Sequence, residues 1–153
     1  MHCLQNKIPP PLVALCFGFV VWLFHERVSW ARVDSNYLPW LAGLFFLMGT
    51  CCSIAGMLSF KAAKTTVNPL QPATASALVT SGIYQITRNP MYVGLMFILL
   101  AWAACLGTLL GLVGAVCFVL YLNWFQIKPE EQALTELFGA DYLEYKSRVR
   151  RWL

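Results

Sequence analysis

Three long stretches of the 153-residue chain carry no charged side chain. They cover residues 8–24, 37–60 and 91–127. A helix that crosses a bilayer needs about 20 mostly apolar residues, so the third stretch has room for two short helices. We expect a turn near residues 105–108, where Gly107 and Gly111 either loosen the chain or let two helices approach closely. The pattern predicts an all-α, polytopic membrane protein with about four transmembrane helices, at residues 8–24, 37–60, 91–106 and 108–127.

The pattern changes after residue 127. Pro129 suits the first turn of a helix, and the acids Glu130 and Glu131 suit the positive end of its dipole. Apolar residues then recur mostly three or four positions apart, which is the spacing of one helix face. These residues are Leu134, Leu137, Phe138, Tyr142, Tyr145 and Val149. The spacing predicts a C-terminal amphipathic helix, over residues 129–151, that lies against the membrane surface.

The basic residues predict how the spans are oriented. With four spans, both termini and the connection at residues 61–90 share one side of the membrane. Of the eleven lysines and arginines, only Arg27 and Arg32 fall on the opposite side. Because basic residues gather on the cytoplasmic side, we expect an integral, multi-pass protein with both termini in the cytoplasm. The chain is short enough that residues 1–153 form a single domain.

The amino-acid composition excludes several classes of protein. Charged residues make up 12% of the chain and hydrophobic residues 59%. Soluble domains average roughly 25% charged residues, which argues against a soluble globular protein. The net charge of +4 is small and scattered, so no nucleic-acid partner is expected. The six cysteines form no CxxC pair and only two histidines are present, so no metal site is expected either.

Polar residues capable of chemistry cluster in two places. One is the connection that ends near Arg88 and Asn89, and the other is residues 126–131. If the last two spans form a hairpin, Arg88 and the acids Glu130 and Glu131 meet at the same cytoplasmic surface. Each residue also has a structural interpretation: Arg88 as a membrane anchor, Asn89 as a helix cap, and the acids as first-turn residues. A long connection in so small a protein nevertheless favours a binding role.

Two sequence runs carry a resemblance to a known family. They are LVTSGIYQITRNPMYVG and, one hairpin later, PEEQALTELFGADYLEYKSRVRRWL. Together they contain LVTxGxY, RxPxY, EExxL, FGxxYxxY and VxRW in that order. This pattern resembles the isoprenylcysteine carboxyl methyltransferases, which are membrane-embedded enzymes that also resemble phospholipid methyltransferases. The match covers about residues 65–153.

The resemblance implies that transmembrane helices hold S-adenosylmethionine at an active site on the cytoplasmic surface. The implied cofactor-binding residues are Leu78, Val79, Tyr84, Arg88, Asn89, Pro90, Tyr92, Glu130 and Glu131. Arg88 or Asn89 would hold the cofactor's carboxylate, and a glutamate would pair with its ammonium. Tyr84 or Tyr92 would stack on the adenine or face the sulfonium. Arg88, Glu130 and Glu131 are the implied catalytic residues, and the backbone of Leu78 and Val79 would contact the adenine edge.

Two departures from the family pattern concern the methyl acceptor. Asn89 replaces a histidine of the members that methylate prenylated proteins. Gln126 replaces an arginine that is associated with the acceptor, so Gln126 is the implied substrate-binding position. The acceptor is expected to be lipophilic: the carboxylate of an isoprenylcysteine-like or other apolar substrate, or the amine of a phospholipid. For an amine acceptor, Glu130 or Glu131 could serve as the base.

Two other functions fit parts of the pattern. A nicotinamide-dependent membrane reductase of the sterol type shares the RxPxY segment but resembles the tail less. A non-enzymatic membrane scaffold subunit fits the hydropathy, but it gives no reason for Arg88, Asn89 and the two acids to converge. Loss of cofactor binding on substitution of Glu130 would separate an enzyme from a scaffold.

Overall fold

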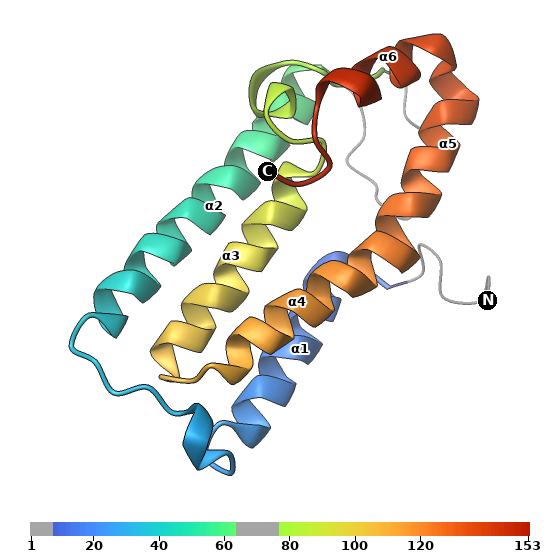
Figure 1. Cartoon of the computed structure of the whole chain (residues 1–153). Coiled ribbons are helices and arrows are strands. Elements are labelled where there is room, and N and C mark those ends of the chain that lie inside the picture. Colours follow the sequence, from blue (N-terminus) through green and yellow to red (C-terminus); the bar gives the residue numbers. More distant parts are fainter. Residues whose placement is uncertain (1–7, 64–76) are drawn as a thin grey trace.

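The computed structural model describes residues 8–63 and 77–153 of the chain. Within these residues the protein is all helical and forms no strand (Figure 1). The elements are α1 (Pro10–Phe24), η2 (Ser29–Ala31), α2 (Leu38–Ala62), η4 (Gly82–Gln85), α3 (Pro90–Cys105), α4 (Leu110–Leu122), η5 (Asn123–Ile127), α5 (Lys128–Phe138) and α6 (Ala140–Arg148). The all-helical prediction is therefore confirmed for the described residues.

The helices pack as a bundle, with α2 lying along α3 and α1 packed against both α3 and α4. The turn η5 joins α4 to α5 in one helical run, so α5 extends beyond one end of the bundle (Figure 1). The chain then reverses through α6 and returns to the start of α3 (Figure 1). This return brings the C-terminal residues to the end of the bundle where the predicted site residues lie.

Four apolar helices form where the sequence predicts spans, but only two helical runs in the described residues are long and apolar enough to cross a membrane. They are α2, with 25 residues, and the 29-residue run Leu110–Phe138. Helices α1 and α3 have 15 and 16 residues, fewer than the about 20 that a straight span needs. The prediction of about four transmembrane helices therefore exceeds the two that length and composition support. Prolines start both short helices, and Gly107, with a φ of +59°, lies in the turn after α3.

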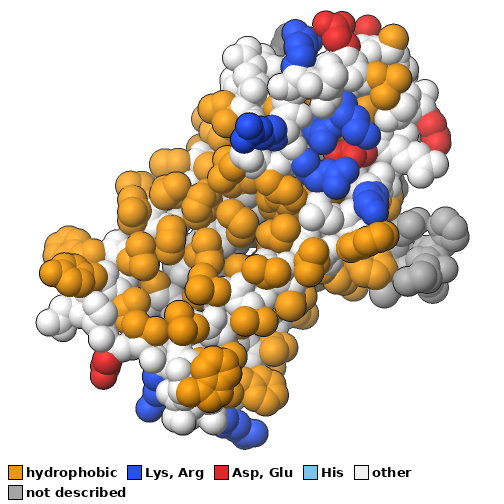
Figure 2. All heavy atoms as spheres, viewed as in Figure 1, with side chains coloured by type: hydrophobic (Ala, Val, Ile, Leu, Met, Phe, Trp, Pro, Cys, Tyr) orange, Lys and Arg blue, Asp and Glu red, His pale blue; other side chains and the backbone are white. Residues whose placement is uncertain are grey.

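The body of the bundle exposes large apolar side chains. Figure 2 shows hydrophobic side chains across the middle of the molecule and charged ones gathered towards its ends. Exposed fractions reach 58% for Phe46, 61% for Leu47 and 60% for Val113. Monomeric proteins in water rarely expose apolar surface so continuously, whereas lipid solvates it well. The surface is that of a membrane protein.

Glycines allow the central helices to approach closely. A Cβ atom on Gly94 of α3 would lie 2.1 Å from Ser53 Oγ and 2.7 Å from the carbonyl oxygen of Gly49, both in α2. A Cβ atom on Gly111 of α4 would overlap Ala103 of α3, at 1.9 Å from its Cβ. The sequence left two roles open for the glycines of the α3–α4 hairpin, a turn or a close helix contact. In the structure Gly107 makes the turn and Gly111 makes the close contact.

We predict that Gly94→Ala destabilises the bundle by about 1–3 kcal/mol, because the added methyl group forces α2 and α3 apart. Gly43→Ala is the matched control, since a Cβ atom there meets nothing within 4 Å. Thermal unfolding in detergent should show a lower midpoint for Gly94→Ala alone. Equal midpoints for the two variants would mean that the α2–α3 contact adapts without cost.

The C-terminal region is not the single amphipathic helix that the spacing predicts. Gly139 adopts a φ of +52°, which ends α5 and begins α6 in a new direction. After α6, Val149 is extended. Tyr142 and Tyr145 are consequently buried, while Leu137 is 44% exposed. The prediction failed because a glycine between two apolar residues was treated as part of the helix and not as its end.

Candidate active site

The candidate site lies at the end of the bundle where α2 ends and α3 begins. Residues 77–89, which include η4, lead into α3 at Pro90, and Asn89 is the residue before the helix. The π-helical turn η5 and the first turn of α5 approach from the other side of the hairpin. Figure 2 shows lysine, arginine and acidic side chains clustered at this end. The hairpin thus brings together the two polar clusters that the sequence identified.

The C-terminal segment is bonded to the residues before α3. The backbone N–H of Arg88 donates to the carbonyl of Arg150 at 2.9 Å, in a bridge between Thr87 and Arg150. The carbonyl of Arg151 accepts from Asn89 Nδ2 at 2.9 Å and from Thr87 Oγ1 at 3.3 Å. Asn89, an implied cofactor contact, therefore uses its side-chain amide to hold the C-terminal segment in place.

Glu131 is the centre of an ion-pair cluster. Its buried carboxylate, 8% exposed, accepts two hydrogen bonds from Arg151, at 2.9 and 2.7 Å. Arg88 Nη2 lies 3.1 Å and Lys146 Nζ 3.4 Å from the same carboxylate. Burial alone would raise the pKa of Glu131, but the hydrogen bonds from Arg151 and the charges of all three cations lower the pKa below its ordinary value. Glu131 thus stays ionised and is fully engaged within the protein.

Glu130 has a different environment. Its Oε1 accepts hydrogen bonds of 2.6 Å from Tyr92 Oη and of 2.6 Å from Gln126 Nε2, both neutral donors. Among the described residues, no lysine or arginine pairs with it. Burial raises the pKa of Glu130 to about 7, and the charge of Glu131 adds to this effect although the two hydrogen bonds oppose it. Glu130 lies beyond the apolar segment that ends at Ile127, and within the described ranges its carboxylate has no cationic partner.

Gln126 lies in the π-helical turn, four residues before Glu130, so the two side chains are neighbours on one helix face. A π turn inserts an extra residue into a helix and changes the direction of the side chains that follow; such turns are frequent at functional sites. Gln126 is 3% exposed and Ile127 is fully buried, so the turn directs both into the interior. Gln126, the implied substrate-binding position, therefore faces the same carboxylate as Tyr92 of α3.

Some hydrogen-bond donors of the Arg88 side chain have no acceptor among the described residues. Its side chain is 10% exposed and contacts Glu131 only through Nη2. The buried Nε and Nη1 atoms have no hydrogen-bond partner among the residues that the structure describes. A buried donor without an acceptor is costly, which points to an anionic or polar ligand beside this guanidinium.

The other implied cofactor residues line the same region. Tyr84 in η4 is buried with its ring edge-to-face against Phe60 of α2, and its carbonyl accepts a 2.8 Å hydrogen bond from Tyr145. Val79 and Pro90 are buried, and Leu78 is partly buried. All of these residues belong to the chain just before α3 or to its first residue.

Sequence reasoning missed the cations that surround Glu131 from the tail. Lys146 and Arg151 belong to the segment that was predicted to lie against the membrane surface, yet both approach this carboxylate. Trp152 Nε1 also donates to Asn123 Oδ1 at 3.1 Å. The VxRW pattern at residues 149–152 marked this segment, but nothing in its spacing showed that the chain would fold back.

Comparisons with known proteins identify the family of the chain. The family model for phospholipid methyltransferases matches residues 37–141, more than half of the chain. A protein-S-isoprenylcysteine O-methyltransferase of Homo sapiens is 32% identical over 133 residues, which cover 81% of this chain and 44% of that protein. A methanethiol S-methyltransferase of Pseudomonas deceptionensis is 30% identical over 130 residues, or 84% of this chain and 47% of that protein.

An uncharacterized protein of Haemophilus influenzae is 49% identical over 63 residues, which are 41% of this chain and all of that protein. The chain spans less than half the length of the named methyltransferases that it matches. The match to the family model includes the segments from α2 to α5 that build the site. The chain belongs to the phospholipid methyltransferase family and is similar to its isoprenylcysteine carboxyl methyltransferases.

Proposed function

We propose that this protein is an integral membrane methyltransferase that uses S-adenosylmethionine to methylate a lipophilic acceptor. In this proposal the four apolar helices all lie in the bilayer, the two shorter ones embedded beside α2 and α4. Both termini and the site face the cytoplasm, in line with the distribution of lysine and arginine. The named relatives support the reaction class.

The main support comes from Arg88 and Glu130. An α-amino acid group carries one carboxylate and one ammonium, so it needs a cationic donor and an anionic acceptor. In the described part of the chain, Arg88 offers buried N–H groups that have no partner, and Glu130 offers a carboxylate that no cation contacts. The amino-acid end of S-adenosylmethionine has this charge pattern, and the residues present therefore fit the cofactor.

The neighbouring residues would position these two groups. Glu131 orients Arg88, and Arg151 and Lys146 balance the remaining negative charge of Glu131. Tyr92 and Gln126 fix the carboxylate of Glu130. S-adenosylmethionine supplies a methyl group bonded to a positively charged sulfur. The chain then contributes alignment and exclusion of water, because displacement at such a carbon needs little acid–base assistance when the acceptor is already ionised.

One observation favours a second acceptor class. A carboxylate acceptor needs no base, whereas an amine must lose a proton during methylation. Burial raises the pKa of Glu130 to about 7, which suits a general base at neutral pH; in this alternative another group, and not Glu130, holds the ammonium of the cofactor. Transfer to a phospholipid amine is therefore the second candidate. Incubation with a lipid extract and methyl-labelled cofactor separates the two, because a methyl ester is cleaved by mild base and an N-methyl group is not.

We predict that Arg88→Ala weakens S-adenosylmethionine binding more than tenfold, since the variant lacks the donors for the cofactor carboxylate. The fold should persist, because Glu131 keeps Arg151 and Lys146 as partners. Arg148→Ala is the control, since Arg148 pairs only with exposed Glu144 among the described residues. Calorimetric titration of both variants tests this, and unchanged affinity in Arg88→Ala would remove Arg88 from the site.

The affinity for S-adenosylmethionine should depend on pH. Glu130 is protonated below about pH 7 and ionised above it, and only the ionised form attracts an ammonium group. Affinity should therefore decrease by up to about tenfold per pH unit as the pH falls below 7. Glu130→Gln should bind more weakly and lose this dependence. An identical pH profile in wild type and Glu130→Gln would assign the ammonium to another group.

A further inference from the structure

A polar cavity lies at the opposite end of the bundle from the candidate active site. It has a volume of about 530 Å³ and is formed by residues 32–35, the start of α2, and the turn that follows α3. The 25-residue α2 runs between the two ends, which places them roughly 37 Å apart. Nothing at this end takes part in the proposed methyl transfer.

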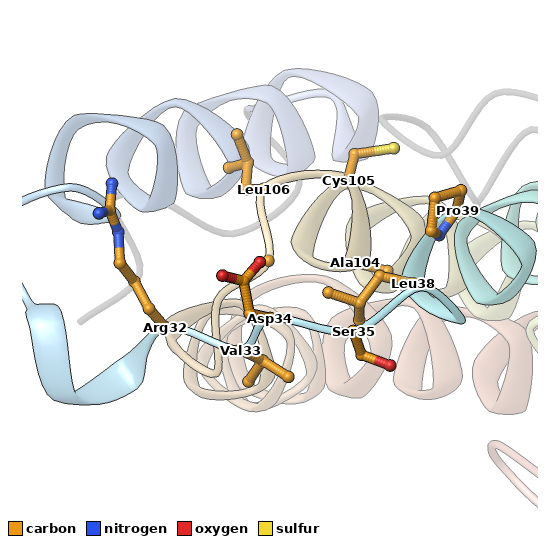
Figure 3. Close-up of a pocket in the computed structure, with 10 residues that line it drawn as sticks. Arg32, Val33, Asp34, Ser35, Leu38, Pro39, Ala104, Cys105 and Leu106 are labelled. Carbon is orange, nitrogen blue, oxygen red and sulfur yellow. The ribbon is translucent and has the colours of Figure 1, made fainter.

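The charged groups of the cavity come from one short extended segment. Hydrogen bonds of 2.8 Å, from Val33 N to Gly107 O and from Leu109 N to Ala31 O, hold this segment against the α3–α4 turn. Arg32 and Asp34 extend to the same side of it, and Val33 and Ser35 point to the other side (Figure 3). Neither Arg32 nor Asp34 forms an ion pair within residues 8–63 and 77–153.

Helix dipoles add charge of both signs. The N-terminus of α2, at Leu38 and Pro39, carries the positive end of a long helix dipole. The C-terminus of α3, at Ala104 and Cys105, carries a negative end. The cavity therefore has two positive groups, Arg32 and the start of α2, and two negative groups, Asp34 and the end of α3. This charge pattern is complementary to a zwitterion.

An apolar groove adjoins this cavity. The groove measures about 970 Å³, lies across α1, α2 and α3, and shares Pro39 and Cys105 with the polar cavity. Aromatic side chains line it, among them Phe19, Trp22 and Phe46. The indole N–H of Trp102 is bonded to the carbonyl of Gly18 at 3.1 Å and is thus not left without an acceptor. The groove suits a hydrocarbon chain.

Exposed aromatic residues locate the polar cavity relative to the membrane. Trp30, Tyr37 and Trp40 lie at this end and are 79%, 80% and 80% exposed. Tryptophan and tyrosine concentrate where lipid headgroups meet the hydrocarbon. The cavity would then lie at headgroup level and the groove at the level of the acyl chains.

We propose that the cavity and groove form a binding site for a zwitterionic, amine-bearing phospholipid of the leaflet opposite the candidate active site. Arg32 binds the phosphate, Asp34 binds the ammonium, and one acyl chain fills the groove. The lipid stabilises the bundle and is not the methyl acceptor. This proposal requires that the chain lies in a bilayer, as proposed above, but it does not require methyl transfer.

Native mass spectrometry of the delipidated, detergent-purified protein tests the site. Phosphatidylethanolamine should bind at least fivefold more tightly than phosphatidylglycerol, which has no ammonium group. Asp34→Asn should abolish this preference, and Arg32→Gln should weaken both lipids at least fivefold while Arg32→Lys retains binding. Equal binding of the two lipids by the wild type, or no effect of Arg32→Gln, would overturn the proposal.

The groove needs a separate test. A side chain on Gly43, which lines the groove, enters open space, so Gly43→Leu should block the acyl chain without disturbing the helices. It should weaken phosphatidylethanolamine binding at least fivefold, whereas Val113→Phe on the exposed face of α4 should not. Glycerophosphoethanolamine, the headgroup without chains, should bind far more weakly than the lipid. Equal binding of the headgroup alone, or unchanged lipid binding in Gly43→Leu, would refute the proposed lipid site.

Discussion

Glu131→Gln is expected to destabilise the protein by about 3 kcal/mol, because it removes the buried anion that neutralises three cations. Arg88, Arg151 and Lys146 would then lie together around a neutral amide. Their mutual repulsion should release the C-terminal segment, since Arg151 bonds to this carboxylate. Thermal unfolding in detergent should show a lower midpoint, and S-adenosylmethionine binding should fall with it.

The chain contains a matched control for this substitution. Glu144 pairs with Arg148 one helical turn away at 3.3 Å, with both side chains more than two-thirds exposed. Exposed pairs of this kind contribute about 0.3–0.5 kcal/mol, so Glu144→Gln should have almost no effect. If the two variants unfold at the same temperature, the cluster around Glu131 does not stabilise the fold.

A chain that ends at Arg148 is expected to lose measurable S-adenosylmethionine binding. The deletion removes the carbonyls of Arg150 and Arg151, which accept hydrogen bonds from Arg88 N and Asn89 Nδ2. It also removes the Arg151 guanidinium and Trp152, so the Arg88–Glu131 ion pair must hold the residues before α3 against α5 without the hydrogen bonds of the C-terminal segment. The helices α1 to α4 should still form, since the deleted segment lies outside them, and circular dichroism should show nearly unchanged helix content.

Substitution of two neighbouring arginines shows whether the side chains or the backbone of the C-terminal segment support S-adenosylmethionine binding. Arg151→Ala should weaken binding at least tenfold, because its guanidinium pairs with Glu131. Arg150→Ala should bind normally, since Arg150 contributes its carbonyl and its side chain is exposed. Retained binding in the truncated chain would mean that the C-terminal segment is only an anchor.

The helices were predictable because apolar stretches without charge leave few other structures in a membrane. The ends of the helices were less predictable, since they depend on single residues. Prolines shorten α1 and α3, and Gly139 divides the expected C-terminal helix into α5 and α6. The close contact between Gly94 and α2 depends on how two helices are paired, and one sequence does not specify that pairing.

The candidate site was partly predictable because the apolar stretches also show which helices form a hairpin. The hairpin of α3 and α4 brings Arg88 near Glu130 and Glu131 once the spans are recognised. Sequence alone did not distinguish the two acids, which carry the same charge and are adjacent. Their different partners separate them: Glu131 is surrounded by cations, and Glu130 by neutral donors. The role of Arg151 depends on the reversal after α6, which no local pattern predicts.

The most direct test of the central claim is equilibrium binding of S-adenosylmethionine to the folded, detergent-purified protein, with a reduced nicotinamide nucleotide as comparator. We expect saturable binding of S-adenosylmethionine and none of the nicotinamide nucleotide, because the partners offered by Arg88 and Glu130 match an amino-acid group. Binding of the nicotinamide nucleotide alone would favour a reductase of the sterol type. Binding of neither by folded protein would contradict the proposed enzyme and favour a scaffold.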